Sequence, residues 1–391
     1  MRSVRDLPLE GRRLFLRVDF NVPLENGRVS DDTRIAETLP TVRLACERGA
    51  RVVCASHLGK AKGKRKPELS LLPVAARFAE LLGKPVLFLD DCVGPDAEKS
   101  ARALAPGEVL LLENLRFHAG EEANDPEFAR QLAALADAYV DDAFGAAHRA
   151  HASVVGVPKL VADRAAGLLL EKEVRELRRL LEPERPFAAI LGGAKISGKI
   201  DTLRVLSRRA DVLLIGGGMA NHFVRALGLS VGKSLLEEDK VTLAREILDF
   251  CKQAGKTIAL PSDFVVAKSP DDGAGARTVP IHKIPDDLMA LDVGPKTLEQ
   301  FERLLQPAKT VFWNGPMGVF EKPPFDKGTM AAARIVSNLK AVTVVGGGES
   351  VQAVHTAGVA GKFTHVSTGG GASLEFLAEG TLPGIEALAG C

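Results

Sequence analysis

Short apolar runs recur along the chain, and each is followed by a loop and a segment with helical periodicity. The runs are rich in valine, leucine and isoleucine and do not alternate with polar residues, which is typical of strands buried on both faces of a parallel sheet. Amphipathic segments such as 71–83 and 297–308 lie between them and predict helices. The predicted strands are 14–20, 51–56, 85–90, 108–114 and 139–144 in the first half, and 187–193, 211–218, 256–262, 310–316, 341–348 and 363–368 in the second half.

The order of these elements predicts an α/β fold, because strand–helix alternation builds parallel sheets flanked by helices. A charged helical stretch, 167–186, separates the two groups of strands and is the best candidate for an interdomain connector. The 391 residues exceed one ordinary core and suit two domains. We therefore predict two open, mainly parallel sheets.

The composition is that of a globular protein with almost no net charge. Hydrophobic residues make up 46% and charged residues 26%, and the net charge is +1. We therefore expect no nucleic acid and no membrane as partner, and any anion site must be local. Five cysteines without a C-x-x-C pair argue against a disulfide framework or a zinc site and suit the reducing cytoplasm. No apolar run approaches the ~20 residues of a membrane span, and the N-terminus lacks a signal-peptide core.

The predicted strands of the first half end in basic side chains. Ligands of open α/β sheets bind beyond the carboxyl ends of the strands. Convergent arginines and histidines at such an edge predict a pocket for a small, multiply charged anion. These residues are Arg17, Arg34, His57, Lys60, Arg116, His118, His148, Arg149 and His151.

The predicted strands of the second half end in glycines instead. The runs are 192–193, 216–218, 346–348 and 369–371. We expect each run to open a helix, where free backbone amides and the positive end of the helix dipole favour phosphate. One such run is usually only a tight turn, but several after buried strands favour a nucleotide site.

One segment nearly matches the phosphate-loop pattern. The window GAKISGKI from Gly193 fits G-x-x-x-x-G-K-[ST] until Ile200, which stands where a magnesium-binding hydroxyl belongs. The acidic pair Asp141 and Asp142 precedes this loop, which is the wrong order for an ordinary phosphate-loop protein. A phosphate-loop NTPase and a nucleotide-binding protein without catalysis remain two possible interpretations.

Several long segments, taken together and in order, resemble the phosphoglycerate kinase family. They are RVDFNVPL (17–24), DDTRI (31–35), SHLGK (56–60), ENLRF (113–117), DAFGAAHRAHAS (142–153), GGAKISGK (192–199), FWNGPMGVFE (312–321) and STGGGASLE (367–375). The resemblance runs from about residue 14 to the C-terminus. It implies reversible phosphoryl transfer between 1,3-bisphosphoglycerate and ADP, giving 3-phosphoglycerate and ATP, with Mg²⁺ as cofactor. It also implies a cytoplasmic, hinge-bending monomer of glycolysis.

The resemblance further implies two Rossmann-like domains joined by an interdomain helix. The phosphoglycerate-binding domain would span 1–166, the helix 167–184 and the nucleotide-binding domain 185–372. A C-terminal segment, about 373–391, would return to the first domain.

The resemblance assigns roles by motif position. The substrate-binding residues would be Asp19, Asn21, Arg34, His57, Lys60, Arg116 and Arg149. The nucleotide-binding residues would be Gly193, Ala194, Lys195, Lys199, Gly217, Gly218, Leu291, Asn314, Pro316, Glu321, Gly347, Gly348, Glu349 and Ser350. The catalytic residues would be Arg34, Lys195, Gly348 and Gly371, and Glu349 would meet the metal.

The resemblance also implies another role for the segment GAKISGKI. Because it places the metal ligand at Glu349, no hydroxyl is needed at position 200. Segment 194–205 would instead start a helix, with Lys195 and Lys199 at i and i+4 on one face. Three residues depart from the family pattern: Lys60 replaces an arginine, Glu349 replaces an aspartate and Ala290 replaces a frequent glycine.

Overall fold

The computed structural model describes residues 1–389 and divides into two compact units. The first unit contains Met1–Arg175 together with the segment that begins at Thr381, and the second contains Glu176–Gly380. Within residues 1–389, no helix combines the length and the apolar character that a bilayer span requires.

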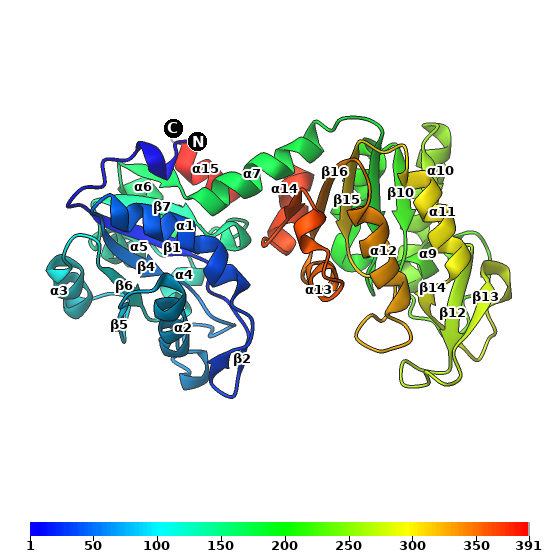
Figure 1. The fold of residues 1–391 in the computed structure, drawn as a ribbon, viewed down its shortest axis with the longest axis horizontal. Helices are drawn as coiled ribbons and strands as arrows, with labels where there is room; N and C mark the ends of the chain where they lie inside the picture. The colour runs from blue at the N-terminus through cyan, green and yellow to red at the C-terminus, as the bar shows by residue number, and fades with distance from the viewer. Residues whose placement is uncertain (390–391) are drawn as a thin grey trace. The chain divides into compact units, whose positions relative to one another are not determined.

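The first unit is built on a six-stranded sheet in the order β5-β6-β4-β1-β7-β8, in which every pair is parallel (Figure 1). The strands are β1 (Arg13–Val18), β4 (Arg51–Ala55), β5 (Leu87–Leu89), β6 (Val109–Leu112), β7 (Ala138–Asp142) and β8 (Arg164–Ala166). All the apolar runs predicted for the first half form strands. The short edge strand β8 was not predicted.

Two of the helices that pack on this sheet have clear caps. The Asp125 side chain accepts a hydrogen bond from the Phe128 N–H (2.8 Å) and thereby caps α5. Gly83, with φ +76°, ends α2 in the left-handed conformation. The helices are α1 (Thr33–Glu47), α2 (Leu72–Leu82), α3 (Pro95–Ala103), α4 (Ala119–Glu122), α5 (Pro126–Ala133), α6 (Val157–Leu160) and α15 (Pro383–Ala389), and a small hairpin pairs β2 (Leu24–Glu25) with β3 (Arg28–Val29).

The predicted connector forms helix α7 (Leu168–Leu181). The buried Asp142 carboxylate accepts hydrogen bonds from the Leu169 and Leu170 N–H groups at 2.9 and 3.1 Å, which fixes the first turn. Burial raises the pKa of Asp142 to about 7. Asp142 is therefore a structural residue at the start of α7.

The second unit is built on another six-stranded parallel sheet, in the order β11-β10-β9-β15-β16-β17. The strands are β9 (Phe187–Leu191), β10 (Val212–Ile215), β11 (Thr257–Ala259), β15 (Thr310–Asn314), β16 (Val342–Gly346) and β17 (His365–Val366). Every predicted strand of the second half is present, and Trp313 is fully buried in the core on β15. The two parallel sheets confirm the predicted α/β class.

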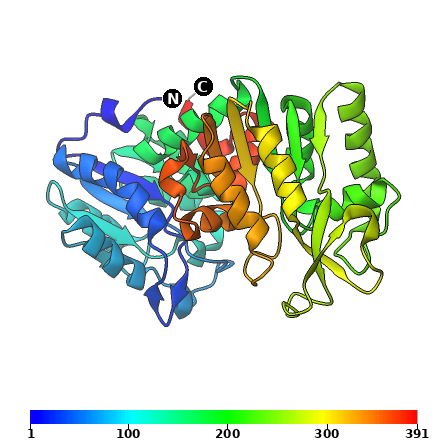
Figure 2. The same cartoon turned by 45° about the vertical axis from the view of Figure 1, so that its right-hand side comes forward.

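A smaller antiparallel sheet in the second unit was not predicted. Its order is β13-β12-β14, and it lies beside the large sheet (Figure 1, Figure 2). Its strands are β12 (Asp263–Ala267), β13 (Arg277–Pro280) and β14 (Met289–Val293). The helices of the unit are α8 (Ile200–Arg209), α9 (Ala220–Ala226), α10 (Val241–Gln253), α11 (Pro295–Leu305), α12 (Lys327–Ser337), α13 (Gly348–Thr356) and α14 (Gly371–Glu379).

The compact units differ in their limits from the predicted domains. The division falls within α7, between Arg175 and Glu176. Helix α14 packs on α8 and belongs to the second unit, and the segment that groups with the first unit begins at Thr381. The domain limits stay a prediction.

Candidate active site

The basic loops of the first unit meet at one edge of its sheet. Strands β6, β4, β1 and β7 are neighbours, and their carboxyl ends point the same way because all pairs are parallel. The loops that follow them carry the predicted substrate-binding residues other than Arg34, which lies in the first turn of α1. The strand order therefore brings together loops that are far apart in the sequence.

Hydrogen bonds tie three of these segments to one another. The Arg34 guanidinium lies 3.2 Å from the Asp19 carboxylate and donates to the Asn21 backbone carbonyl at 3.0 Å. The Asn21 side-chain oxygen accepts from the Gly59 N–H at 2.9 Å. A third of the Arg34 side chain remains exposed (33%), so the guanidinium is held in place and still accessible to a ligand.

His57 lies at this edge as a neutral ring. The Arg17 guanidinium lies 3.1 Å from His57 Nδ1, and an arginine can only donate, so Nδ1 accepts and Nε2 carries the proton. Burial lowers the pKa of His57 well below its usual value, and the charges of Arg17 and Arg116 lower it further. His57 therefore offers an N–H donor rather than the positive charge expected of a basic residue.

Arg116 is a buried cation with unused hydrogen-bonding capacity. Its side chain is 3% exposed, and Nη1 donates to the Gly59 carbonyl at 2.7 Å. The Nε and Nη2 atoms are buried and have no hydrogen-bond partner, since the nearest carboxylate, that of Glu122, is 3.6 Å from Nε. Burial, and then the charge of Arg149, lower the pKa of Arg116. An anion would satisfy both the free donors and the excess positive charge.

The other basic residues at this edge differ in their charge and exposure. Arg149 and Lys60 are exposed. Burial and the neighbouring arginines lower the pKa of His151 to about 3, so its 3.8 Å contact with Glu121 is not an ion pair. His118 is bound elsewhere, with its ring nitrogen 2.7 Å from the Asp91 carboxylate.

In the second unit, the glycine runs hold three loops close together. The Gly193 N–H donates to the Pro316 carbonyl at 2.9 Å, and the Gly217 N–H donates to the Met317 carbonyl at 3.0 Å. Gly217 has φ +62°, and a Cβ atom there would lie 2.7 Å from both the Gly193 nitrogen and the Pro316 oxygen. Only glycine fits this position, and the reason is loop packing.

The remaining residues predicted near the base and ribose belong to the same loop cluster. A Cβ atom on Gly218 would lie 2.6 Å from the Ala194 carbonyl oxygen. The buried Leu291 on β14 accepts from the Val319 N–H at 2.9 Å, which ties β14 to the loop that ends in the exposed Glu321. Their contact with a nucleotide stays a prediction.

A cavity of about 260 Å³ gathers many of the predicted nucleotide-binding residues. It lies where β15 and β16 end, at the N-termini of α13 and α14. Two helix N-termini present free amides to the same space, which suits a phosphate group. The lining residues are Lys199, Asn314, Gly315, Gly347, Gly348, Glu349, Ser350, Gly370, Gly371 and Leu374.

The walls of this cavity are fixed by short polar contacts. The Asn314 side chain donates to the Gly346 carbonyl at 2.8 Å, and the Ser350 hydroxyl accepts from the Gly315 N–H at 2.5 Å. Gly347 has φ +92°, and a Cβ atom there would lie 2.7 Å from the Asn314 amide nitrogen. Asn314 and Ser350 thus hold the turns between strands and helices.

Lys195 and Lys199, in the segment that nearly matches the phosphate-loop pattern, differ in environment. The prediction that they share one helix face is wrong. Helix α8 begins only at Ile200, after the short 3₁₀ turn η6 (Ser197–Lys199), and Lys195 precedes both. Gly192 and Gly193 accordingly do not open a helix. Lys195 is exposed, whereas the Lys199 ammonium donates to the Gly192 carbonyl at 2.8 Å. Burial lowers the pKa of Lys199 to about 8, although Glu349 opposes the shift.

The partly exposed Glu237 and the buried His222, which sequence reasoning missed, hold the loop between these lysines. The Glu237 carboxylate accepts from the Ile196 and Ser197 N–H groups, each at 3.1 Å. His222 Nε2 accepts from the Glu237 N–H at 3.0 Å, and its Nδ1 lies 3.2 Å from the Met219 carbonyl. No motif of the sequence marks either residue, because both act through backbone atoms of a distant loop.

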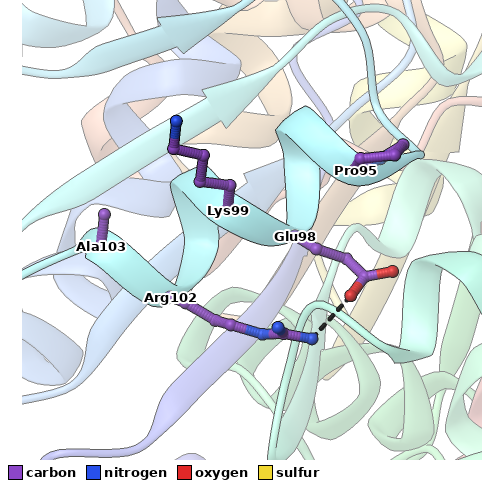
Figure 3. Close-up of a pocket in the computed structure, with 5 residues that line it drawn as sticks. All are labelled: Pro95, Glu98, Lys99, Arg102 and Ala103. Atoms are coloured by element: carbon purple, nitrogen blue, oxygen red, sulfur yellow. Dashed lines mark hydrogen bonds and ion pairs between the residues drawn. The ribbon is translucent and has the colours of Figure 1, made fainter.

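A further surface pocket of the first unit lies on α3, and no predicted site residue lines it (Figure 3). Glu98 and Arg102, one helical turn apart, form an ion pair there at 2.6 Å. Its other lining residues are Pro95, Lys99 and Ala103. The pocket contains no buried polar group that would select a ligand.

Comparison with known proteins shows the family of the chain. The sequence model described as phosphoglycerate kinase matches residues 4–380. The phosphoglycerate kinase of Moorella thermoacetica is 56% identical over 387 residues, covering 99% of this chain and 98% of that protein. The chain belongs to the phosphoglycerate kinase family.

Other members of the family agree over the same length. The phosphoglycerate kinase of Pelotomaculum thermopropionicum is 53% identical over 388 residues, covering 99% of this chain and 98% of that protein. The solved structure of phosphoglycerate kinase from Coxiella burnetii is 39% identical and has a TM-score of 0.89, covering 99% of this chain and 98% of that one. Membership makes the chain an enzyme of glycolysis, a kinase whose acceptor is a carboxyl group.

Removing the Glu237 carboxylate is expected to weaken nucleotide binding. In Glu237→Ala, two backbone N–H groups lose their acceptor, which costs about 1–3 kcal/mol and loosens the loop that carries both lysines. We expect the KM for MgATP to rise about tenfold and kcat to change less. Steady-state kinetics measure this. Glu238→Ala is the matched control, because Glu238 is an exposed neighbour whose nearest cation is 3.9 Å away. Equal KM values in both variants would contradict a positioning role.

Nucleotide affinity is expected to fall as the pH rises through about 8. The Lys199 ammonium is charged below its lowered pKa of about 8 and neutral above it, and only the charged form attracts phosphate. The dissociation constant of MgADP, measured by calorimetry from about pH 7 to about pH 9.5, should rise by up to about tenfold per pH unit above the pKa. Lys199→Met should remove this dependence. An identical pH profile in that variant would show that another group is responsible.

Proposed function

We propose that the basic edge of the first unit binds 3-phosphoglycerate, and that the cavity of the second unit binds the phosphates of ATP or ADP. The observation that carries this proposal is the pair of buried, unpartnered Arg116 nitrogens. A substrate phosphate or carboxylate would accept from them. Arg149 and the neutral His57 would hold the remaining oxygens, with Lys60 at the exposed rim.

The reaction needs no general base on this substrate. In the ATP-consuming direction the attacking group is the substrate carboxylate, which is ionised at neutral pH. His57 fits this chemistry because, with Arg17 3.1 Å from its Nδ1 and its pKa lowered, it supplies a hydrogen-bond donor and takes up no proton. Phosphoryl transfer then depends mainly on positioning and on positive charge around the transferred group.

We propose that Arg34 and Lys195 supply this charge from the two sides of the transferred phosphoryl group. Both side chains are accessible, and Arg34 is fixed by Asp19 and Asn21. The amides of Gly348 and Gly371, at the starts of α13 and α14, would add to it.

The two ligands must also meet with water excluded, because water would hydrolyse the acyl phosphate. We therefore infer closure of the two units around the substrates. Helix α7 and the segment 369–373, which contains the start of α14, are the proposed hinges.

Mg²⁺ fits the residues at the nucleotide cavity. Glu349 is an exposed carboxylate on the cavity wall, and Mg²⁺ is usually bound by one or two carboxylates together with substrate phosphates and water. Glu349 would hold the ion, which neutralises phosphate charge when it is bound. The extra methylene of Glu349, relative to the family's aspartate, would be accommodated by the loop or by an intervening water.

The resemblance also supports finer assignments that we carry forward as proposals. They are a phosphoglycerate-binding domain (1–166), an interdomain helix (167–184), a nucleotide-binding domain (185–372), a monomeric state and the cytoplasm as compartment. The reduced cysteines Cys46, Cys54, Cys92 and Cys251 agree with a reducing compartment.

A coupled turnover assay with 3-phosphoglycerate and MgATP tests the proposal against its alternatives. We expect ADP formation that depends strictly on 3-phosphoglycerate. A phosphate-loop NTPase would release ADP without the acid, and Ile200→Thr would enhance that release; we expect no such gain. A binding protein without catalysis would bind MgATP and show no turnover.

A further inference from the structure

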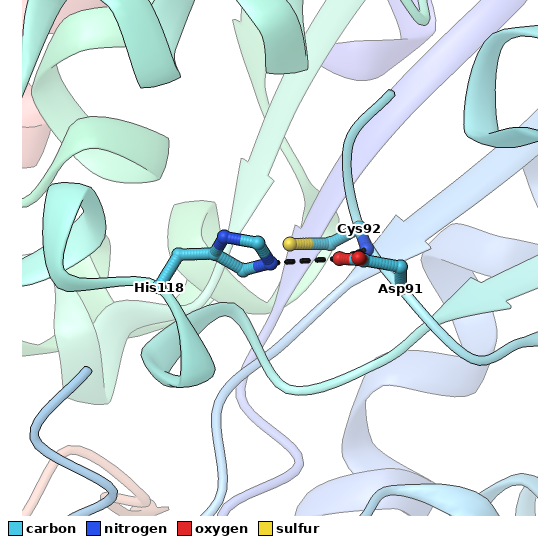
Figure 4. Close-up of side chains that lie close together, drawn as sticks. All are labelled: Asp91, Cys92 and His118. Atoms are coloured by element: carbon cyan, nitrogen blue, oxygen red, sulfur yellow. Dashed lines mark hydrogen bonds and ion pairs between the residues drawn. The ribbon is translucent and has the colours of Figure 1, made fainter. Parts of the chain in front are cut away.

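Three side chains with metal-binding atoms meet outside the candidate active site. His118 Nε2 lies 2.7 Å from Asp91 Oδ1, and the ligand atoms of Asp91, Cys92 and His118 all lie within 4.8 Å of one another. Figure 4 shows the Cys92 sulfur beside the contact between the His118 ring and the Asp91 carboxylate. The cluster combines one oxygen, one nitrogen and one sulfur donor.

The fold holds this cluster together from two neighbouring strands. Asp91 and Cys92 follow β5, and His118 follows β6, which pairs with β5 in parallel. The Cys92 N–H donates to Asp91 Oδ1 at 2.6 Å, and the His118 ring stacks on Phe128 with ring centroids 5.2 Å apart. The three donors are therefore gathered by packing and by backbone contacts before any ion binds.

The donor set selects one chemical class of ion. Zinc-class divalent cations bind thiolate, imidazole and carboxylate together in a tetrahedral arrangement, whereas Mg²⁺ prefers oxygen ligands in an octahedron. We propose that Asp91, Cys92 and His118 form a binding site for a zinc-class divalent cation, with solvent in the fourth position. Asp91 is exposed, which leaves an open side for the solvent ligand and for entry of the ion.

Cys92 supplies the sulfur donor, and its side chain is 1% exposed. A bound zinc-class ion would replace the thiol proton, which passes to solvent, and the sulfur would become a thiolate ligand.

Titration of the full chain with Co²⁺, without nucleotide, tests the site. Co²⁺ takes zinc positions, and a thiolate ligand gives it a charge-transfer band in the near ultraviolet. We expect one equivalent of Co²⁺ per chain with this band, loss of the band on adding Zn²⁺, and no loss with excess Mg²⁺. The readout is absorbance, so it is independent of catalysis and of the proposed function.

Variants assign the band to these three residues. Cys92→Ser should abolish the band, and His118→Gln and Asp91→Asn should each weaken Co²⁺ binding about tenfold or more. Cys46→Ser is the control, because Cys46 is a more exposed thiol of the same unit and should leave the band unchanged. Circular dichroism checks folding, and the His118 and Asp91 variants decide the question if Cys92→Ser does not fold. Absence of the band in the wild type, or its survival in all three variants, would overturn the proposal.

Discussion

Replacing Arg34 with alanine is expected to lower kcat by about 10²–10³-fold, because one preorganised charge contact in the transition state is worth that much. The Arg34 guanidinium is held by Asp19 and by the Asn21 carbonyl, so it needs little reorganisation when the phosphoryl group moves. The KM for MgATP should change only a few-fold, since nucleotide binding is assigned to the other unit. Steady-state kinetics with 3-phosphoglycerate and MgATP measure both parameters.

Arg43→Ala is the matched control for this prediction. Arg43 lies on the same helix, is exposed, and donates only to the Leu81 carbonyl at 3.0 Å. It should retain wild-type kcat. Turnover of Arg34→Ala within a few-fold of wild type would show that Arg34 does not act on the transferred group.

The second large effect is expected at Arg116. Arg116→Met keeps much of the side-chain volume and removes the two unpartnered donors. Each charge-assisted hydrogen bond is worth about 1.5–3 kcal/mol, so the KM for 3-phosphoglycerate should rise by at least about 10²-fold. Without substrate, Arg116→Met should lower the free energy of unfolding only slightly. The buried Arg116 guanidinium lies among other positive charges, so its burial is itself unfavourable.

Thermal unfolding with and without 3-phosphoglycerate separates binding from folding in this variant. The acid should raise the Tm of the wild type and have almost no effect on Arg116→Met. Arg130→Met, at an exposed residue paired with Glu127, should behave as the wild type. A variant that loses stability in the absence of the acid but keeps the wild-type KM would show that Arg116 is structural only.

The large sheets could be predicted because their strands are buried on both faces. An unbroken apolar run such as VLLL in β6 predicts a central parallel strand by itself. The antiparallel sheet was missed in part because its edge strand β13 lies at the surface, where every residue is at least partly exposed. Such strands are stabilised by pairing with distant segments, which no local pattern reveals.

The candidate site could be predicted only as far as motifs name side chains. The gathering of these side chains was predictable because strand ends must meet at one sheet edge, and the structure places Asn21, Arg34 and Arg116 in one hydrogen-bonded group with Gly59 and Asp19. The protonation state of His57 could not be predicted, because it depends on Arg17 and on burial. The helix predicted around Lys195 failed because an i, i+4 spacing is compatible with a turn as well as with a helix.

The cluster of Asp91, Cys92 and His118 shows the same limit. Asp91 and Cys92 are adjacent, but His118 is distant in the sequence and no ligand spacing links it to them, so the cysteine pattern alone argued against a zinc site. Only the pairing of β5 with β6 brings them together.

The central claim is that Arg34 of one unit and Lys195 of the other act on the same transferred phosphoryl group. The most direct test is a crystal structure of the enzyme with 3-phosphoglycerate, MgADP and tetrafluoroaluminate, which mimics the phosphoryl group in the transition state. We predict that the Arg34 guanidinium and the Lys195 ammonium both lie within hydrogen-bond distance of the fluorides. A structure in which either side chain contacts no fluoride, while both ligands are bound, would contradict the claim.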